Sequence, residues 1–487
     1  MKIKGFAAGI AVLFLVTVAS ALAADPTDKS FGTKGIAEIE ASLPEGQTEG
    51  FEEGLGSVVD LEPDGHGKLL AAVGPIPESI RHNHFFAAAR ILPDGRPDPG
   101  FGRDGLTRSR RVEIPDGEGG AASGALRAEA VAPVAGGKVL LAGFFDDGEA
   151  YAPVLARFTP RGRPDPGFGH RGRRVYARLS GGVILHGGQR MAGGERIHDV
   201  AVRHDGTIVG VGDVVAGPRG VAHTPQPAAL VRAWRPDGTV DHGFGRDGRL
   251  AIRVPRGGGY SGFSKVEILP SGKILVAGYL RRQLVVYRLS ADGRIDRSFG
   301  GGGRVTVGVR GEAISYQHPA SLAVDRDGRI VLTGRPILDG PVVEAQVLLR
   351  LLPDGRRDRS FGARTVPGTA GRIRGGYVYL TFETRAVTID GRGRVVVTGG
   401  EFANDGRGEG DEALTSRRFL PDGRPDRFFG HDGIWFTAPP GSRSTGYASA
   451  TQPDGRVIAG GWVQLERGSR ERDFHHGNTA MLLTRYR

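Results

Sequence analysis

The pattern Asp-x-x-Phe-Gly occurs seven times along the chain of 487 residues and constrains its fold more than any other feature. Successive phenylalanines of the pattern are 70, 67, 76, 55, 62 and 68 residues apart. A motif that returns at a period of this size is typical of repeated supersecondary units, each of which buries its apolar face only against its neighbours. We call the pattern the signature motif and expect its phenylalanine to anchor each unit; these residues are Phe31, Phe101, Phe168, Phe244, Phe299, Phe361 and Phe429.

Each unit contains four short segments with the composition of β-strands. In the unit that ends at Phe299 they are residues 248–254, 263–269, 273–278 and 284–289, separated by turn-forming residues. Segments such as 274–278 and 395–399 are apolar at almost every position, so both faces of these strands must be covered. Sheets that stack face to face around an axis provide this environment. We therefore predict an all-β chain with four-stranded antiparallel sheets arranged as the blades of a β-propeller.

The two ends of the chain are in complementary phase with the repeat. The signature at Phe31 has no strand segment before it, whereas the last strand segment, residues 481–487, has no signature after it. If residues 35–39 add a fourth strand to three C-terminal strands, no sheet edge is left free. The prediction is one seven-bladed β-propeller over residues 24–487, closed in this 3+1 manner by the N-terminal strand.

An arginine lies at a constant offset before most signature motifs. One unit has Ala233 at this position instead. We hypothesise that each arginine pairs with the aspartate of a signature motif and buries its aliphatic stem, which makes it a structural residue of the repeat. The arginines are Arg90, Arg157, Arg288, Arg350, Arg418 and Arg485.

The repeat resembles a known bacterial family. Residues 92–102, Leu-Pro-Asp-Gly-Arg-Pro-Asp-Pro-Gly-Phe-Gly, together with Gly-Lys-Ile-Leu-Val-Ala-Gly at 272–278, resemble the delta-60 repeat, and the resemblance covers nearly all of residues 24–487. The sequence departs from the pattern at Gly136-Gly137, which replaces Asp-Gly, and after Phe361-Gly362, where the usual glycine is missing. The resemblance implies a propeller-like, often secreted protein, and it implies no reaction and no catalytic residue.

The first residues have the features of a secretion signal. Lys2 and Lys4 precede an apolar run, and Ala21-Leu22-Ala23 forms a small-x-small cleavage site. An uncleaved membrane anchor is the alternative, because the run approaches the roughly 17-residue minimum for a membrane span. We expect cleavage of residues 1–23, no stable membrane span afterwards, and a secreted or periplasmic monomer.

Composition restricts the chemistry of the chain. There is no cysteine, so disulfides, thiolate metal sites and thiol nucleophiles are excluded. The net charge of +11 favours acidic partners, although the repeated arginines account for part of it. No basic stripe is interleaved with stacking aromatics, which makes nucleic acid an unexpected partner.

Polar and aromatic residues cluster where the predicted innermost strands begin. Because antiparallel strands alternate in direction, the long connections of all units fall on one face, opposite the tight Asp-Gly turns, and binding is usual on such a face. Aromatic and charged groups at a concave mouth suit the recognition of sugars or peptides, although a wet channel mouth has the same composition. The candidate ligand-binding residues are Arg196, His198, Tyr260, Tyr316, His318, Tyr379, Glu383 and Tyr447.

The sequence contains no catalytic motif that we can identify. A Gly-x-Ser-x-Gly elbow, a His-Glu-x-x-His motif and a phosphate-binding glycine loop are all missing, and we expect no catalytic residue, cofactor or metal. The sequence favours a non-enzymatic scaffold that binds a glycan, peptide or protein ligand through its loop-rich face. A hydrolase or lyase acting on a polymer, with a site assembled from several blades, is the alternative.

Overall fold

The computed structural model describes the strands and turns of the repeat. The described residues are 25–39, 57–74, 86–108, 114–115, 121–122, 125–146, 150–169, 173–175, 193–215, 227–254, 261–281, 283–308, 320–335, 346–362, 373–374, 377–380, 382–402, 412–437, 442–464 and 479–487. Every regular element in these ranges is a β-strand. The predicted signal, residues 1–23, lies outside them.

Four sheets have the predicted four strands. The first contains β2 (Ser57–Pro63), β3 (Leu69–Gly74), β4 (Ala87–Ile91) and β5 (Leu106–Arg108). The second contains β16 (Gly262–Ile268), β17 (Ile274–Leu280), β18 (Gln283–Leu289) and β19 (Arg304–Val307). The third contains β25 (Glu383–Ile389), β26 (Val395–Phe402), β27 (Glu412–Phe419) and β28 (Ile434–Thr437). All neighbouring strands in these sheets are antiparallel.

The fourth sheet joins the two ends of the chain. It consists of β29 (Ser444–Thr451), β30 (Val457–Gln464), β31 (Thr479–Tyr486) and the N-terminal β1 (Ile36–Ile39). Strand β1 pairs with β31 in the register Ile36 to Thr484, which is the pairing that the phase of the chain ends predicts. The Asp28 N–H also donates to the Arg485 carbonyl, at 2.8 Å.

The remaining strands depart from the expectation of separate four-stranded sheets. Eight strands form one sheet: β8 (Ala125–Val134), β9 (Lys138–Asp146), β10 (Ala150–Phe158), β11 (Arg173–Val175), β12 (Gly193–Val202), β13 (Ile208–Val215), β14 (Ala228–Trp234) and β15 (Arg249–Arg253). Two groups of four merge because β10 and β12 pair in parallel at Tyr151 and Gly194. A glycine is needed at this pairing, because a Cβ added at Gly194, where φ is +148°, would lie 2.0 Å from the Tyr151 carbonyl oxygen.

A five-stranded sheet is the second departure. It contains β20 (Ser321–Val324), β21 (Ile330–Gly334), β22 (Gln346–Leu351), β24 (Tyr377–Leu380) and β23 (Ile373–Arg374). This is the unit whose signature has Thr365 where others have a glycine such as Gly105, which adopts a φ of +83°. Its outer strand follows the signature much later in the chain than β5 follows Phe101. A ribbon of β6 (Ile114–Pro115) and β7 (Ala121–Ala122) completes the described strands.

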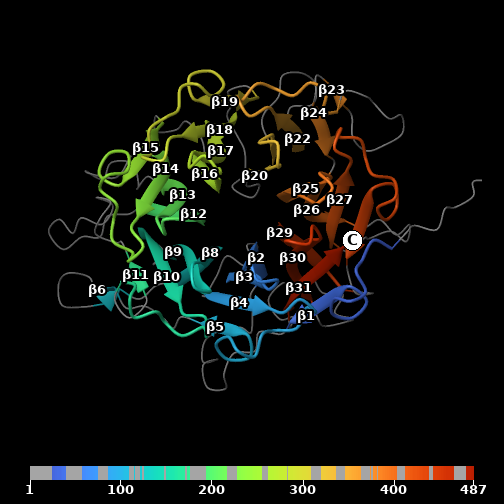
Figure 1. Ribbon diagram of the computed structural model, residues 1–487, viewed down its shortest axis with the longest axis horizontal. Coiled ribbons are helices and arrows are strands. Elements are labelled where there is room, and N and C mark those ends of the chain that lie inside the picture. Colours follow the sequence, from blue (N-terminus) through green and yellow to red (C-terminus); the bar gives the residue numbers. More distant parts are fainter. Residues whose placement is uncertain are drawn as a thin grey trace, which may run out of the picture.

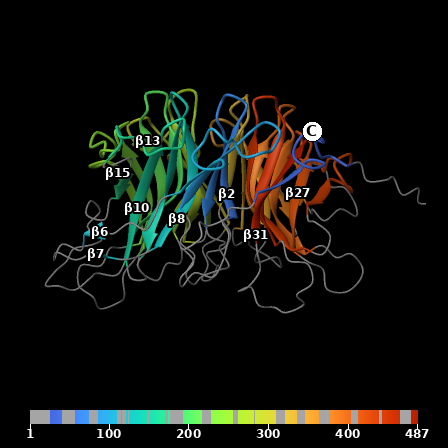
Figure 2. The same cartoon turned by 90° about the horizontal axis from the view of Figure 1, so that it is seen from below.

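The sheets radiate around a central axis. Figure 1 shows strands such as β2, β12, β25 and β29 nearest the centre and β5, β15 and β19 towards the periphery. Figure 2 shows the short turns of the described residues along one face of this ring, as the alternating strand directions predict. The chain is therefore all-β and propeller-like.

The apolar core lies between neighbouring sheets. One cluster, for example, joins Val58 and Leu61 of β2 to Ile458 of β30 and Leu483 of β31. The seven signature phenylalanines are at most 1% exposed. Each signature phenylalanine is followed by a glycine, and in six of the seven motifs that glycine's N–H donates to a turn carbonyl of the next unit, as Gly245 does to Asp292 at 2.7 Å. The signature therefore holds consecutive units together.

Six arginines reinforce the contacts between neighbouring units, which we call seams. We call these residues clamp arginines: Arg90, Arg157, Arg288, Arg350, Arg418 and Arg485. Each forms an ion pair with a signature aspartate, at N–O distances of 2.6–2.9 Å, which confirms the pairing hypothesis. Each guanidinium also lies 4.4–4.8 Å from the centre of a signature phenylalanine ring. Five of them donate to a carbonyl of the neighbouring unit, as Arg288 does to Pro353. One side chain thus links an aspartate, a ring and the next unit.

The innermost strands share a β-bulge. Six of them shift register by one residue against their neighbour, and the residue at the shift is Val59, Glu129, His198, Ser264, Arg385 or Tyr447. A bulge re-aims the side chain that it carries. The glycine that ends each apolar strand segment permits this geometry: a Cβ added at Gly399 would lie 1.7 Å from the Glu383 carbonyl oxygen.

Candidate ligand-binding site

The predicted site residues do not form a single group. Arg196 and His198 lie on β12, whereas Glu383 begins β25 and Tyr447 lies on β29, on the other side of the ring in Figure 1. Tyr379 pairs with Val347 of β22 and thus lies on an outer strand, not on the innermost strand where we expected it. Tyr260, Tyr316 and His318 lie outside the described residues.

Arg196 and His198 form the centre of a cluster that spans the joined sheets. Both bind Asp213 of β13: Arg196 through two hydrogen bonds of 3.0 and 2.6 Å, and His198 through Nε2 at 2.8 Å. His198 Nδ1 lies 3.8 Å from Glu129 of β8. We call this group the mouth cluster; it comprises Arg127, Glu129, Phe144, Asp146, Tyr151, Arg196, His198 and Asp213.

Local backbone geometry brings these side chains together. Glu129 and His198 occupy the bulges of β8 and β12, so each is turned out of the regular alternation of its strand. Asp146 ends β9 and Tyr151 follows at the start of β10, at the ends of the strands that are opposite the tight turns. The cluster therefore lies on the face that we predicted for binding, and the parallel pairing of β10 with β12 holds its two halves in contact.

Aromatic rings form one side of the mouth cluster. Phe144 packs edge-on against Tyr151, with 5.8 Å between ring centres, and against His198 at 6.2 Å. The guanidinium of Arg196 lies 5.2 Å from the centre of the Tyr151 ring. Arg127 lies on β8. Its Nε atom is 3.7 Å from Asp146, which is beyond hydrogen-bond reach, and it has no acceptor among the described residues. A buried donor without an acceptor is uncommon in folded proteins.

The charges of the cluster are fixed by their neighbours. Burial alone would lower the pKa of His198, but the hydrogen bond to Asp213 and the nearby carboxylate of Glu129 outweigh it and raise the pKa to about 9. Burial would raise the pKa of Asp213, but Arg196 and His198 hold it far below its ordinary value. At neutral pH the cluster therefore contains an imidazolium ion and a carboxylate that remain charged.

The raised pKa of His198 predicts a pH-dependent stability. Stabilisation from a raised pKa is complete below the unfolded value of about 6.5 and is lost as the pH rises through about 9. The shift corresponds to about 3 kcal/mol. We expect wild-type protein to lose this stabilisation between pH 6.5 and 9, and the His198→Gln variant to lack it. Urea denaturation at several pH values measures the difference; a constant gap between the two proteins over this range would contradict the assignment. His242→Gln, an exposed histidine, is the control.

Glu383 and Tyr447 belong to a second group. Arg385, at the bulge of β25, lies 3.3 Å from Glu383 and 4.9 Å from the centre of the Tyr447 ring. Tyr447 is 8% exposed, and its hydroxyl accepts a hydrogen bond from the Trp462 indole at 3.3 Å. Here the bulge residues of two neighbouring innermost strands contact each other, so the contact links the sheets.

Sequence reasoning missed a charged group on the inner wall of the ring. Lys265 of β16 lies 3.4 Å from Asp199 of β12 and 3.6 Å from Asp60 of β2. Burial raises the pKa of Asp199 to about 7 in spite of the lysine. Asp199 and Asp60 also accept backbone N–H groups of the next innermost strands, those of Val266 and Val131. These residues tie three sheets together. The signal for them in the sequence is a charged residue directly after three of the six bulges, where the other three bulges are followed by alanine.

The described residues contain no group of three histidine, aspartate or glutamate side chains placed to hold a metal ion. Among the same residues, no helix is long and apolar enough to cross a membrane.

Two segments of the chain match a β-propeller family. Residues 137–168 and 269–299 fit the family described as "Domain of unknown function (DUF5122) beta-propeller". Each segment runs from the turn before an apolar strand to the next signature phenylalanine, which is the most regular part of the repeat. The match supports a propeller-like repeat family. No curated protein matches the chain.

Solved structures with a similar backbone fold include sialidases. A mutant of the NanB sialidase from Streptococcus pneumoniae is 11% identical, with a TM-score of 0.43, over 92% of this chain and 70% of that one. A protein of unknown function from Dyadobacter fermentans is 10% identical, with a TM-score of 0.41, over 93% and 100%. Trypanosoma rangeli sialidase is 9% identical, with a TM-score of 0.41, over 93% and 59%. Likeness at this level does not extend to the residues of a site.

Proposed function

We propose that this protein is an exported, non-enzymatic scaffold that binds a ligand through the face opposite its tight turns. The proposal includes a closed ring of seven blades, in which the eight-stranded sheet counts as two blades and β1 completes the last, and membership of the delta-60 repeat family. It also includes a monomeric state, removal of residues 1–23, and a secreted or periplasmic location.

The observation that carries the binding function is the aromatic pair of the mouth cluster beside partly exposed charged side chains. Tyr151 is half-buried next to Phe144, and the nearby side chains of Arg127 and Glu129 are 24% and 32% exposed. The cluster contains three basic residues and three carboxylates, so it suits an uncharged ligand that stacks on a ring and exchanges hydrogen bonds. Among the glycan, peptide and protein ligands that the sequence allows, these features favour a neutral glycan.

The electrostatics of the same cluster favour binding over acid–base catalysis. A general base must be deprotonated at the working pH, whereas His198, with a pKa of about 9, is protonated at neutral pH. A general acid must hold a proton, whereas Arg196 and His198 keep Asp213 ionised. His198 is therefore excluded as a general base and Asp213 as a general acid, and the lowered pKa of Asp213 makes it a weak base.

Binding and hydrolysis are separated by one set of variants. A printed glycan array identifies neutral glycans that bind, and calorimetry measures their affinity. We expect Tyr151→Ala to weaken this binding about fivefold or more, because ring stacking is worth about 1 kcal/mol or more. Tyr151→Phe keeps the ring and retains most of the affinity. Phe428→Ala, which removes an aromatic side chain that is 85% exposed, is the control. Release of reducing ends by wild type that disappears in His198→Gln would establish the hydrolase instead.

A further inference from the structure

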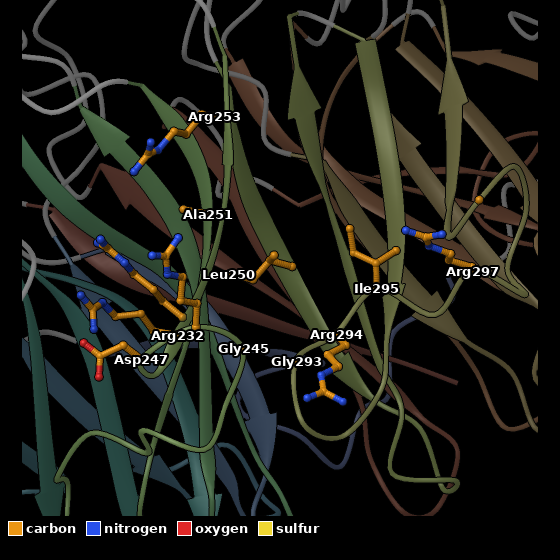
Figure 3. Close-up of a pocket in the computed structure, with 13 residues that line it drawn as sticks. Arg232, Gly245, Asp247, Leu250, Ala251, Arg253, Gly293, Arg294, Ile295 and Arg297 are labelled. Carbon is orange, nitrogen blue, oxygen red and sulfur yellow. The ribbon is translucent and has the colours of Figure 1, made fainter.

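A large cavity lies at the periphery of the ring, away from the mouth cluster. It has a volume of about 1320 Å³ and separates β15 from the turn that follows β18 (Figure 3). Residues 245–253 form one wall, and residues 293–297 with Gly302 form the other. Figure 3 shows arginines on both walls. The arginines that line the cavity are Arg232, Arg246, Arg249, Arg253, Arg294 and Arg297.

Half of these arginines lack a carboxylate. Arg232 and Arg249 share the buried Glu195, at 2.5 and 3.0 Å, and Arg294 lies 3.4 Å from Asp292. The side chains of Arg246, Arg253 and Arg297 have no ion pair or hydrogen bond within the described part of the chain, and all three are exposed. Elsewhere, turn arginines of the repeat pair with the aspartate two residues before them: Arg96 with Asp94, Arg356 with Asp354 and Arg424 with Asp422. The cavity is also lined by the carboxylate of Asp247, so its lining carries six arginines and one aspartate. Positive charge therefore predominates at this cavity.

These arginines do not hold the ring together. The cavity lies at the seam where Ala233 replaces the clamp arginine, and Arg203 supplies the contact across the seam by donating to the Ala291 carbonyl at 3.2 Å. Most other units also direct a second cation at the signature aspartate, as Lys68 does at Asp98, whereas this unit has Thr207 at that position. Arg246 and Arg297 occupy signature positions that carry arginine in other units too, such as Arg103 and Arg359. What distinguishes this seam is that both line one cavity together with Arg253.

The distance between the arginines indicates a ligand longer than a single ion. Arg249 and Arg253 are four residues apart on β15, or about 13 Å at about 3.3 Å per residue, a backbone spacing that suits successive anionic groups of a chain better than a single phosphate or sulfate ion. A smaller cavity of about 210 Å³ continues from Arg253 and is lined by Arg281 of the β17–β18 turn and Arg304 of β19. We call the two cavities together the arginine groove. Its shape fits a chain that carries anionic groups at intervals.

We propose that the arginine groove binds a linear acidic polysaccharide, with carboxylate or sulfate groups on the free arginines. The guanidinium fork matches both groups with two parallel hydrogen bonds. Among the described residues, no aromatic side chain lines either cavity, and single-stranded nucleic acids need such rings for base stacking. The net charge of +11 attracts polyanions towards the molecule, and the groove presents several arginines to them.

The test uses heparin-derived oligosaccharides of increasing length and oligogalacturonates as probes for the full-length protein. We expect affinity to rise with chain length, to fall steeply with salt, and to drop at least tenfold in the triple variant Arg246→Ala, Arg253→Ala, Arg297→Ala. Because these side chains have no partners, the variant should fold like wild type, which circular dichroism checks. The matched control, Arg96→Ala, Arg356→Ala, Arg424→Ala, removes the same charge from exposed turns of other units and should change affinity less than about twofold.

Three results would overturn the proposal. Equal loss of affinity in the two triple variants would mean that only overall charge matters. Inorganic sulfate that binds as tightly as the longest oligosaccharide would show a small-anion site. Single-stranded DNA of equal charge that binds more tightly than the glycans would assign the groove to nucleic acid.

Discussion

Phe299→Ala is expected to destabilise the protein by about 3–5 kcal/mol, the usual effect of removing a fully buried aromatic ring. The ring is 0% exposed and packs with Leu275, Leu322 and Leu349 from two neighbouring sheets, so its loss opens a cavity in a seam. The Arg288 guanidinium, 4.8 Å from the ring centre, would also lose its aromatic neighbour. Urea denaturation followed by fluorescence or circular dichroism measures the change.

The control for this variant is another phenylalanine beside a signature motif. Phe428 directly precedes Phe429 but is 85% exposed. Phe428→Ala should therefore change the free energy of unfolding by less than about 0.5 kcal/mol. If both substitutions had similar small effects, the signature ring would not be the anchor of its unit.

Arg350→Ala is the second substitution with a large expected effect, about 3–5 kcal/mol, because it leaves a buried carboxylate without its cation. Arg350 and Asp358 side chains are 6% and 9% exposed and 2.8 Å apart. The substitution also removes the hydrogen bond to the Pro421 carbonyl across the seam and the contact with the Phe361 ring. We expect a lower urea midpoint and faster cleavage by protease.

A double variant separates the two parts of this effect. Arg350→Ala with Asp358→Asn removes the unpaired charge and should recover part of the lost stability, while the seam contact stays broken. Arg356→Ala, which removes an arginine that is 76% exposed and pairs within its own turn, should change stability by less than about 0.5 kcal/mol. A cost as small for Arg350→Ala would show that the clamp does not stabilise the seam.

The repeat made much of the fold predictable from sequence. The signature phenylalanine, the apolar strand segments and the phase of the chain ends depend on local patterns, and each recurs often enough to be read without a structure. The pairing of β1 with β31 and the ion pairs of the clamp arginines followed from the same regularity. An arginine that recurs at the same offset in most units, as Arg90 does, is better explained by a structural role in the repeat than by ligand binding.

The features that were missed are the irregular ones. The parallel pairing at Tyr151 and Gly194 joins two units across a long connection, and no local pattern marks it. Tyr379 was placed on an innermost strand because its unit was assumed to be regular, whereas the missing signature glycine coincides with a displaced outer strand. The arginine groove needs two units in space, since Arg253 and Arg297 come from different sheets.

The glycine at the end of each apolar strand segment is a sequence signal that predicts the position of the bulge. Each apolar strand segment ends in a glycine, and in five units the structure places that glycine against the carbonyl before the bulge, as Gly212 lies against Arg196. The residue two positions after that carbonyl occupies the bulge, which identifies His198, Glu129 and Tyr447 as side chains that contact a neighbouring unit. The same rule would have predicted the contact between His198 and Glu129.

The pairing of β1 with β31 also has a consequence for the time course of folding. A chain synthesised from its N-terminus makes Ile36 long before Thr484, its partner, leaves the ribosome. Until then the first strand has no neighbour to complete its ladder, and the loop that must close is nearly the whole chain. The last step of assembly is therefore expected to be slow, and chaperone dependence should be concentrated in the period before the final residues are released.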